Sequence, residues 1–297
     1  MNSNSRDSQL LSTYFPQTWD KALSMITKDA TWERLMQSVA SSYKETTVFP
    51  PASSLFRAFN ACSFEDTKVV ILGQDPYHSV SSSNLGASMP AHAGIATGLA
   101  FSVDKEEKVP PSLRNIIKEG KRDIGPSFLE SSERSGAINQ GGGILSHWAD
   151  QGVLLLNTAL SVKAHSPKSH SRLGWDFLVD RVLRALAAKR DGVIFVLWGN
   201  DAKAWGNRSI RATCEGGIVN SQVDSQVDPR VDLQVNSRAD SQLNSNPLSY
   251  KASKTCEYYI LEAGHPSPLS VRYFSGCSHF SKINKILEDI GESPILW

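Results

Sequence analysis

Two short segments carry the side chains best suited to chemistry. Residues 73–78 read Gly-Gln-Asp-Pro-Tyr-His, and residues 264–270 read Gly-His-Pro-Ser-Pro-Leu-Ser. The first segment offers an amide, a carboxylate, a phenol and an imidazole within five residues, and the second adds another imidazole. Such groups bind polar ligands and transfer protons, so both segments are candidates for one functional site.

Each of these segments follows a run of apolar residues. Four such runs occur, over residues 68–73, 152–157, 192–199 and 258–263. The runs are continuous rather than alternating, which is typical of strands covered on both faces in a parallel sheet. Amphipathic patterns predict helices over residues 19–43, 111–120, 177–190 and 279–291. This alternation predicts an α/β fold with a mostly parallel sheet and a helical N-terminal part.

Polar residues stand at the end of every apolar run. The second run ends in Asn157, and the third is followed by Gly199 and Asn200. In open α/β sheets, ligands bind in a crevice at the carboxyl ends of the strands. We therefore expect the four clusters to surround a single crevice.

Composition limits the function without naming it. The chain has 297 residues, of which 40% are apolar and 21% charged, and its net charge is +1. A basic surface for nucleic acid must therefore be local. The four cysteines form no zinc-type spacing, and neither a signal peptide nor an apolar stretch long enough to span a membrane is seen. We predict one soluble, cytoplasmic domain over residues 1–297.

Two parts of the chain are predicted to lie outside the core. Residues 1–12 are polar and predict a frayed tail. Residues 219–247 repeat every four residues, with Asn or Asp after each apolar marker and frequent Ser. This composition disfavours a helix and predicts a disordered, low-complexity insertion over residues 216–252.

The motifs together resemble a known family. In order along the chain, they are GQDPYH (73–78), GLAFS (98–102), PPSL (110–113), GVLLLN (152–157), VLWGN (196–200), HPSPLS (265–270) and GCSHFSK (276–282). Their order and spacing resemble uracil-DNA glycosylase of the family-1 type, from about Leu55 to Trp297. The resemblance implies a three-layer α/β fold, in which helices flank a central four-stranded parallel sheet on both faces.

The resemblance also implies an activity. The enzyme would flip uracil out of single- or double-stranded DNA and hydrolyse its N-glycosidic bond, leaving an abasic site. It would act as a monomer without metal or cofactor, and a DNA-mimicking inhibitor protein is a possible partner. Asp75 would stabilise the cationic sugar and activate water, and His265 would donate a hydrogen bond to uracil O2.

Base recognition and DNA contacts are assigned by the same resemblance. Asn157 would pair with uracil N3–H and O4, Tyr77 would exclude the methyl group of thymine, and Phe101 would stack on the base. Gln74 would lie near uracil O2, and Leu269 would wedge into the gap left in the duplex. The predicted DNA contacts are His78, Pro110, Pro111, Ser112, Gly199, Asn200, Ser267, Leu269 and Ser270, with Arg272 and Lys282 as a basic rim.

The sequence departs from the family pattern after the first motif. A long loop over residues 79–97 follows, and Ile95 and Thr97 stand where the family usually has Gln and His. Asn200 stands where a Ser is common. We expect activity to be retained, with altered contacts from this loop.

Two other hypotheses remain open. In the first, the chain is a metal-dependent hydrolase that uses Asp75, His78 and His265, although Pro76 suits a rigid turn better than a chelate. In the second, the chain is a binding module that has lost its chemistry, against which the presence of Asp75, Asn157 and His265 argues.

Overall fold

The computed structural model describes residues 3–81, 94–104, 107–129, 143–189, 192–213 and 258–297. The insertion predicted over residues 216–252 lies outside the described residues. So does most of the long loop predicted over residues 79–97.

Within the described residues, six strands form two sheets. The strands are β1 (Val48–Phe49), β2 (Val69–Gly73), β3 (Val153–Asn157), β4 (Val162–Lys163), β5 (Val193–Trp198) and β6 (Tyr258–Ala263). The central sheet has the order β3-β2-β5-β6, and all its neighbours are parallel. β1 and β4 form a small antiparallel pair. β2, β3 and β5 are buried along their whole length. Burial on both faces therefore explains their continuous apolar runs, as predicted from the sequence.

The helices are α1 (Ser3–Thr13), α2 (Gln17–Ala22), α3 (Ala30–Glu45), α4 (Arg57–Ala61), α5 (Pro111–Ile124), α7 (Ser146–Ala149), α8 (Trp175–Ala187), α9 (Asn200–Trp205) and α10 (His279–Asp289). Short 3₁₀ turns are η1 (Ile26–Lys28), η2 (Ala52–Ser54), η5 (Arg211–Thr213) and η6 (Val271–Tyr273), and η4 (Gly206–Ile210) is a π turn.

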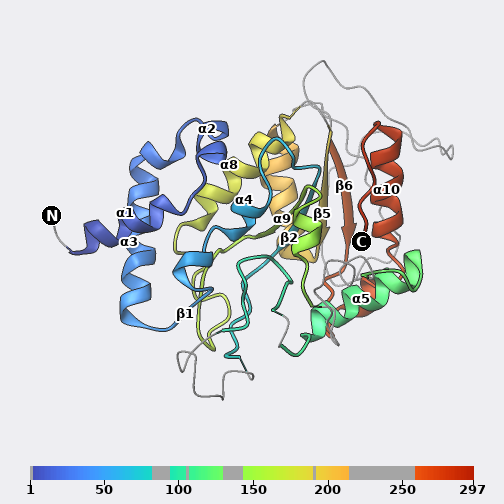
Figure 1. The fold of residues 1–297 in the computed structure, drawn as a ribbon, viewed down its shortest axis with the longest axis horizontal. Helices are drawn as coiled ribbons and strands as arrows, with labels where there is room; N and C mark the ends of the chain where they lie inside the picture. Colours follow the sequence, from blue (N-terminus) through green and yellow to red (C-terminus); the bar gives the residue numbers. More distant parts are fainter. Residues whose placement is uncertain (1–2, 82–93, 105–106, 130–142, 190–191, 214–257) are drawn as a thin grey trace, which may run out of the picture.

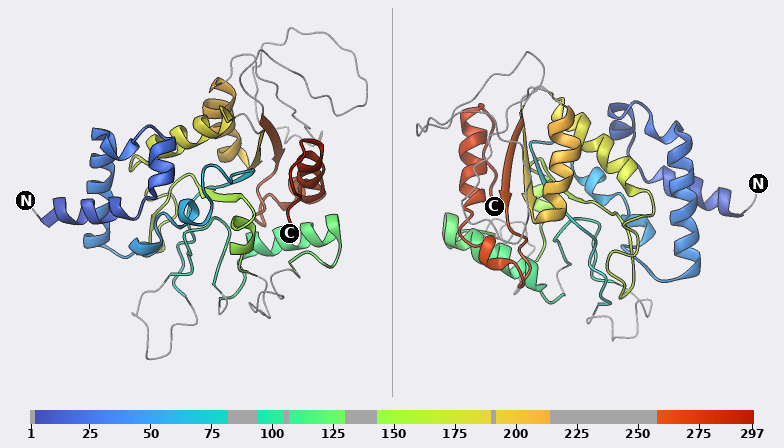
Figure 2. Two further views of the ribbon diagram at one scale, coloured as in Figure 1. Left: turned by 45° about the horizontal axis from the view of Figure 1, so that its top comes forward. Right: turned by 180° about the vertical axis from the view of Figure 1, so that it is seen from behind.

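The central sheet is covered on both faces. In Figures 1 and 2, α3 and α8 lie on one side of the sheet, and α5 and α10 lie on the other. The predicted three-layer α/β fold with a four-stranded parallel sheet is therefore confirmed. None of the helices within the described ranges is long and apolar enough to cross a lipid bilayer.

The register aligns the strand ends at one edge. Gly73 at the end of β2 pairs with Asn157 at the end of β3, and Trp198 at the end of β5 pairs with Ala263 at the end of β6. The loops that follow these strands therefore begin side by side.

The N-terminal part differs from its prediction in two places. The helix predicted over 19–43 is broken between α2 and α3, because Ser24 and Met25 adopt positive φ angles of 57° and 59°. The expected frayed tail over 1–12 is instead helix α1. Leu11 is buried, and Trp32 of α3 donates a hydrogen bond of 3.0 Å to Ser12 Oγ, so this polar segment packs against α3 in a way that its composition did not reveal.

Candidate active site

A cavity of about 180 Å³ opens at the carboxyl edge of the central sheet. It is smaller than the roughly 300–1,000 Å³ typical of pockets for drug-sized ligands, so it suits a single small ring. Its lining residues are Gln74, Asp75, Pro76, Tyr77, His78, Ala96, Gly98, Leu99, Phe101, Ser112, Asn157, Pro167 and His265.

The cavity brings together most of the predicted site residues. All those assigned to catalysis or to the base line it, and His78 and Ser112 from the DNA set join them. The other predicted DNA contacts do not line the cavity: Pro110, Pro111, Gly199, Asn200, Ser267, Leu269 and Ser270. Several of these lie beside lining residues, since Ser267 donates its main-chain N–H to His265 and Pro110 and Pro111 precede Ser112.

Asp75 lies in the turn after β2 and is partly buried. Its Oδ2 accepts a hydrogen bond of 2.6 Å from the main-chain N–H of Lys168. Burial raises the pKa of the Asp75 carboxyl, Lys168 and His78 oppose this rise, and the charge of Asp201 adds to it. A carboxylate in such a setting can stabilise a nearby positive charge or accept a proton from water.

His265 follows β6, and a main-chain hydrogen bond determines which of its ring nitrogens carries the proton. Its Nδ1 accepts a hydrogen bond of 3.0 Å from the main-chain N–H of Ser267. Because that N–H is only a donor, a neutral imidazole at this position carries its proton on Nε2. Burial lowers the pKa of His265, against the opposing effect of Asp201. The ring is thus suited to donate a hydrogen bond through Nε2 while neutral.

Gly199 permits this placement of His265. It has a φ of 93°, and a β-carbon there would lie 2.8 Å from His265 Cβ. Gly73 has a similar relation to Asn157, because a β-carbon at residue 73 would overlap Asn157 Oδ1. The Asn157 side chain, which is 8% exposed, can therefore turn its amide into the cavity only beside a residue without a side chain.

Tyr77 and Phe101 form the aromatic wall. The Tyr77 hydroxyl donates a hydrogen bond of 3.1 Å to the Phe101 carbonyl oxygen. Phe101 adopts a φ of 65°, and its ring packs against Trp198 and His265 at centroid distances of 5.7 and 6.3 Å. Burial raises the pKa of Tyr77, so this hydroxyl stays protonated and keeps both rings in place.

The loop after β2 is tied to the loop after β3. The carbonyl oxygen of Gln74 accepts hydrogen bonds from the main-chain N–H of Ala159, at 3.1 Å, and from Thr158 Oγ1, at 3.0 Å. The Gln74 side-chain amide donates to the carboxylate of Asp201 in α9. Three strand ends thus contribute to fixing residues 74 and 75.

Lys168, Pro167 and Asp201 belong to the site but were missed in the sequence. His165, three residues before Lys168, does not line the cavity; its N–H donates to the carbonyl oxygen of His78 at 2.8 Å. Asp201 lies directly after the strand-end residue Asn200, and that position was the available signal. Nothing in the sequence marks the main-chain N–H of Lys168.

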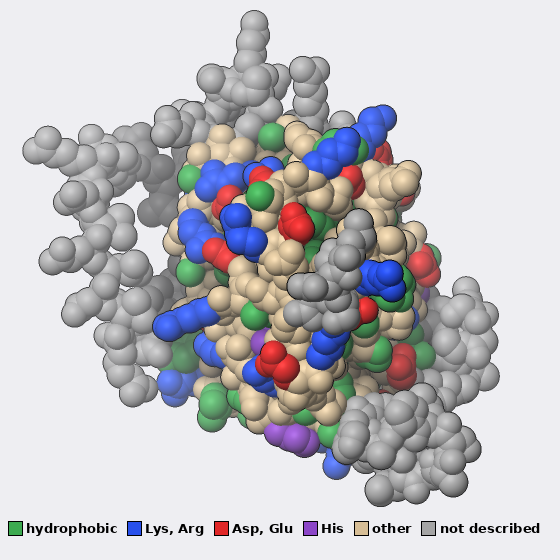
Figure 3. Space-filling model, turned by 90° about the vertical axis from the view of Figure 1, so that its left-hand side faces the viewer, with side chains coloured by type: hydrophobic (Ala, Val, Ile, Leu, Met, Phe, Trp, Pro, Cys, Tyr) green, Lys and Arg blue, Asp and Glu red, His purple; other side chains and the backbone are tan. Residues whose placement is uncertain are grey.

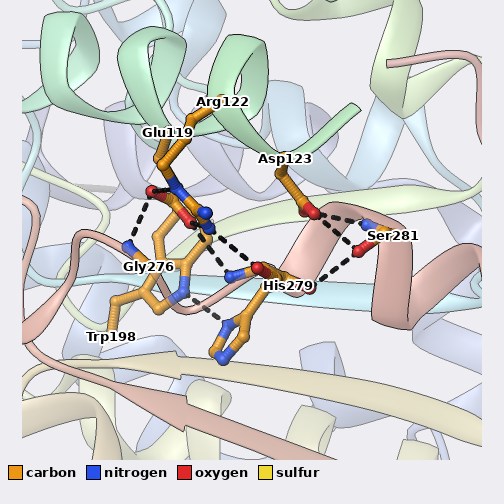
Figure 4. A network of polar contacts seen from close by, with 8 residues as sticks. Glu119, Arg122, Asp123, Trp198, Gly276, His279 and Ser281 are labelled. Atoms are coloured by element: carbon orange, nitrogen blue, oxygen red, sulfur yellow. Dashed lines mark hydrogen bonds and ion pairs between the residues drawn. The ribbon is translucent and has the colours of Figure 1, made fainter. Parts of the chain in front are cut away.

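Helix α5 presents Ser112 in its first turn and is fixed at its other end by a polar network (Figure 4). Glu119, 2% exposed, accepts hydrogen bonds from Arg122 at 2.8 and 2.9 Å and from the N–H groups of Gly276 and Ser278 at 2.8 and 3.0 Å. Asn115 also donates to the carbonyl oxygen of Pro266 at 2.7 Å. The helix therefore anchors the loop after β6.

That loop carries the most exposed large apolar side chain among the described residues. Leu269 is 94% exposed. The loop around it is ordered by its own hydrogen bonds, because the N–H of Ser270 donates to the carbonyl oxygen of Ser267 at 3.0 Å. Arg272 lies over the Tyr273 ring at 4.5 Å. A stable loop thus presents an apolar tip to solvent.

Surface charge is mixed elsewhere. On the face formed by the N-terminal helices, Lys and Arg side chains lie among Asp and Glu (Figure 3). This agrees with a net charge of +1.

Thr97, predicted to alter the loop contacts, is buried, and its carbonyl oxygen accepts a hydrogen bond from Arg57 at 3.1 Å. Ala96 and Gly98 on either side of it line the cavity.

The described part of the chain contains no group of three or more His, Cys, Asp or Glu side chains arranged to hold a metal ion. The set Asp75, His78 and His265 of the metal hypothesis is not such a group. Fold and cavity together define a class, an α/β enzyme that binds a small polar ring at the carboxyl edge of a parallel sheet.

A family model described as the uracil DNA glycosylase superfamily matches residues 59–288, and the chain belongs to this superfamily. It is 37% identical over 280 residues to the uracil-DNA glycosylase of Clostridioides difficile, with 94% of this chain and 95% of that protein covered. It is 36% identical over 281 residues to that of Porphyromonas gingivalis, covering 94% and 96% of the two chains.

Solved structures support the fold. The mimivirus uracil-DNA glycosylase aligns with a TM-score of 0.68 and 24% sequence identity, covering 97% of this chain and 88% of that one. A mimivirus variant, Y322L, solved in complex with UGI, also aligns with a TM-score of 0.68 and 24% identity over 97% and 90% of the chains.

Proposed function

We propose that this chain is a uracil-DNA glycosylase of the family-1 type, a monofunctional and metal-independent hydrolase. It flips uracil out of DNA and hydrolyses the N-glycosidic bond, releasing uracil and leaving an abasic site for base excision repair. The observation that carries the proposal is the meeting of Asp75, Asn157 and His265 in one cavity of about 180 Å³.

Asp75 acts on the sugar. As the bond between C1′ and the base nitrogen breaks, positive charge grows on the sugar, and an ionised carboxylate stabilises it. Asp75 also orients the water whose oxygen bonds to C1′. The hydrogen bond from the N–H of Lys168 supports this role, because it holds one carboxylate oxygen in place, and no main-chain donor among the described residues bonds to the other.

His265 acts on the base. The departing uracil gains negative charge at O2, and a neutral imidazole that donates from Nε2 stabilises this charge. The hydrogen bond from the N–H of Ser267 to Nδ1 and the burial-lowered pKa of His265 support this assignment.

The remaining lining residues select uracil. Asn157 accepts from N3–H and donates to O4, a pattern that cytosine does not match. Tyr77 occupies the space of a C5 methyl group, and Phe101 stacks on the base. Gln74 lies near O2, its side-chain amide held by Asp201.

DNA binds along the loops around the cavity. Ser112 in the first turn of α5 and His78 are proposed phosphate contacts. The same role is proposed for Pro110, Pro111, Gly199, Asn200, Ser267 and Ser270. Leu269 enters the space left by the flipped base. An inhibitor of the UGI type, as bound in the mimivirus complex, would compete for this edge.

The activity is tested with single-stranded and duplex oligonucleotides that carry one uracil. We expect uracil release and abasic sites in the presence of excess chelator. Loss of all activity with chelator would favour the metal-dependent hypothesis, and DNA binding without release would favour the binding module.

The catalytic assignment is tested with Asp75→Asn and His265→Leu. Each should lower single-turnover cleavage by about 10²–10³-fold while binding of uracil-DNA is kept. Asp176→Asn, which changes an exposed carboxylate in the first turn of α8, is the matched control and should cleave at the wild-type rate.

A further inference from the structure

Asp75 depends on a loop that is itself held in an unusual conformation. The donor to Asp75 Oδ2 is the main-chain N–H of Lys168. Lys168 and nearby His165 adopt positive φ angles of 60° and 56°, which residues with a side chain seldom adopt unless other contacts impose them. The position of this N–H is therefore set by what holds the loop.

The base of the loop is held on the side of β4. The N–H of Lys163 donates to Ser169 Oγ at 2.9 Å, and Ser161 Oγ lies 2.8 Å from His170 Nδ1. These contacts fix residues 169 and 170 but do not reach the residue that donates to Asp75.

The carbonyl oxygen of Lys168 accepts a hydrogen bond of 3.1 Å from the main-chain N–H of Ser171 in the same loop. The side chain of Lys168 adds a contact outside the loop. Its Nζ lies 3.2 Å from Oδ2 of Asp201. The same carboxylate accepts the side-chain amide of Gln74, the residue before Asp75. One carboxylate in α9 thus holds both chain segments that flank Asp75.

We propose that Asp201 and Lys168 form a positioning pair, which holds the Asp75 carboxylate in place through the Lys168 main-chain N–H and the Gln74 side chain. This inference rests on the proposed function, because it assigns the pair to the cleavage step. Neither member of the pair lines the cavity, so both act through Asp75.

The pair contributes to placement rather than to stability. Both side chains are 59% exposed, and ion pairs so exposed add little to the free energy of unfolding. Small displacements of a catalytic group can nevertheless cost large factors in rate. We therefore expect the variants to fold normally and to cleave slowly.

The two members have opposite electrostatic effects on Asp75. The charged groups that face its carboxyl are Lys168, His78 and Asp201; the first two lower its pKa and the third raises it, on top of the larger rise caused by burial. Removing the charge of Asp201 should lower the pKa of Asp75, and removing that of Lys168 should raise it. A pair too distant to act on the Asp75 carboxyl would shift its pKa in neither direction.

The test uses Asp201→Asn and Lys168→Met in the full chain. Single-turnover cleavage of a uracil oligonucleotide at saturating enzyme and low salt should fall about five- to tenfold in each. The acid limb of the rate–pH profile should move to lower pH in Asp201→Asn and to higher pH in Lys168→Met. Asp201→Glu, which keeps the charge, should retain the wild-type midpoint.

The matched control is the pair Lys285 and Asp289 on α10, which is also exposed. Lys285→Met and Asp289→Asn should leave rate and midpoint unchanged. The proposal is overturned if Asp201→Asn and Lys168→Met behave like these controls, shift the limb in the same direction, or alter only the affinity for DNA.

A titration without substrate separates this proposal from the proposed function. The carboxyl carbon of Asp75, followed by NMR across pH, should show the same opposite shifts in the two variants. If these shifts occur and the wild-type chain releases no uracil, the assigned function fails while the electrostatic coupling stands. If uracil is released and the shifts are absent, the proposed role of the pair is wrong and the proposed function stands.

Discussion

Main-chain donors hold both of the residues to which we assign chemistry. Asp75 accepts from the N–H of Lys168, and His265 accepts from the N–H of Ser267. A main-chain donor is independent of the side chain that its residue carries. The sequence therefore indicated Asp75 and His265, but the main-chain donors that orient them could be identified only from the folded structure of the loops.

Tyr77 should determine the rejection of thymine. Its ring lines the cavity, and its hydroxyl is fixed on the Phe101 carbonyl oxygen. Tyr77→Ala should open space for a C5 methyl group, so that thymine is released from DNA above the wild-type background. Tyr77→Phe, which keeps the ring, should not release thymine. Thymine left intact by the alanine variant would contradict this role.

Asn157 should determine the rejection of cytosine. Its amide lies at the end of β3 with 8% exposure, and a carboxyl at this position would offer a different hydrogen-bond pattern. Asn157→Asp should release cytosine slowly and release uracil less efficiently, measured as free base from matched oligonucleotides. A variant that loses uracil release without gaining cytosine release would show that this residue does not select the base.

At the level of elements, α5 joins Ser112, a proposed phosphate contact, to the loop after β6. Glu119 is the centre of this contact (Figure 4), and its pKa is lowered because, although burial opposes it, Arg122 and the N–H groups of Gly276 and Ser278 favour the charged form. Charged hydrogen-bond networks of this kind cost more to break than exposed pairs.

Glu119→Gln should therefore destabilise the fold by about 2–4 kcal/mol. The amide cannot accept from Arg122 and from both main-chain donors as the carboxylate does. The expected result is a lower urea midpoint at unchanged slope, and Glu288→Gln, at an exposed position of α10, is the control. An unchanged midpoint would mean that this contact adds nothing to stability.

The strands were the most predictable elements. Burial on both faces leaves a continuous apolar run, so β2, β3 and β5 fall where the sequence placed them. The break between α2 and α3 was not predictable, because apolar periodicity continues through Ser24 and Met25 while their backbone turns left-handed. Helix α1 was missed for the opposite reason, since its polar sequence carries little apolar periodicity.

For the whole molecule, two buried histidines link stability to pH. Burial lowers the pKa of His279 to about 3 and that of His170 to about 4, and Trp198 donates to Nδ1 of His279 at 3.0 Å. The unfolded chain binds protons at these histidines near pH 6.5, whereas the folded chain does not. Stability is therefore full above about pH 6.5 and falls as the pH drops towards 4.

His279 alone should remove about 2 kcal/mol of stability between pH 7 and pH 5. Urea unfolding at the two pH values measures this loss. His279→Gln should be less stable at pH 7 but should show a smaller difference between the two values. An equal pH dependence in both proteins would assign the acid sensitivity to other groups.

Leu269 projects from the surface of the folded protein. An apolar tip that is 94% exposed packs against little of the described part of the chain, so its proposed use is in the duplex. Leu269→Ala should slow uracil release from duplex DNA by at least about tenfold and leave release from single-stranded DNA nearly unchanged. Equal losses on both substrates would contradict a wedge.

Gly73 is a position at which this protein cannot accept a larger residue without moving Asn157. The hydrogen that it carries instead of a methyl group is what leaves space for the amide of Asn157, although Gly73 itself belongs to a buried strand and is absent from the cavity wall. Replacing it with alanine, among the mildest of substitutions, would displace the group proposed to tell one pyrimidine from another. Selection for accurate choice of the base would thus act on a residue that does not line the cavity.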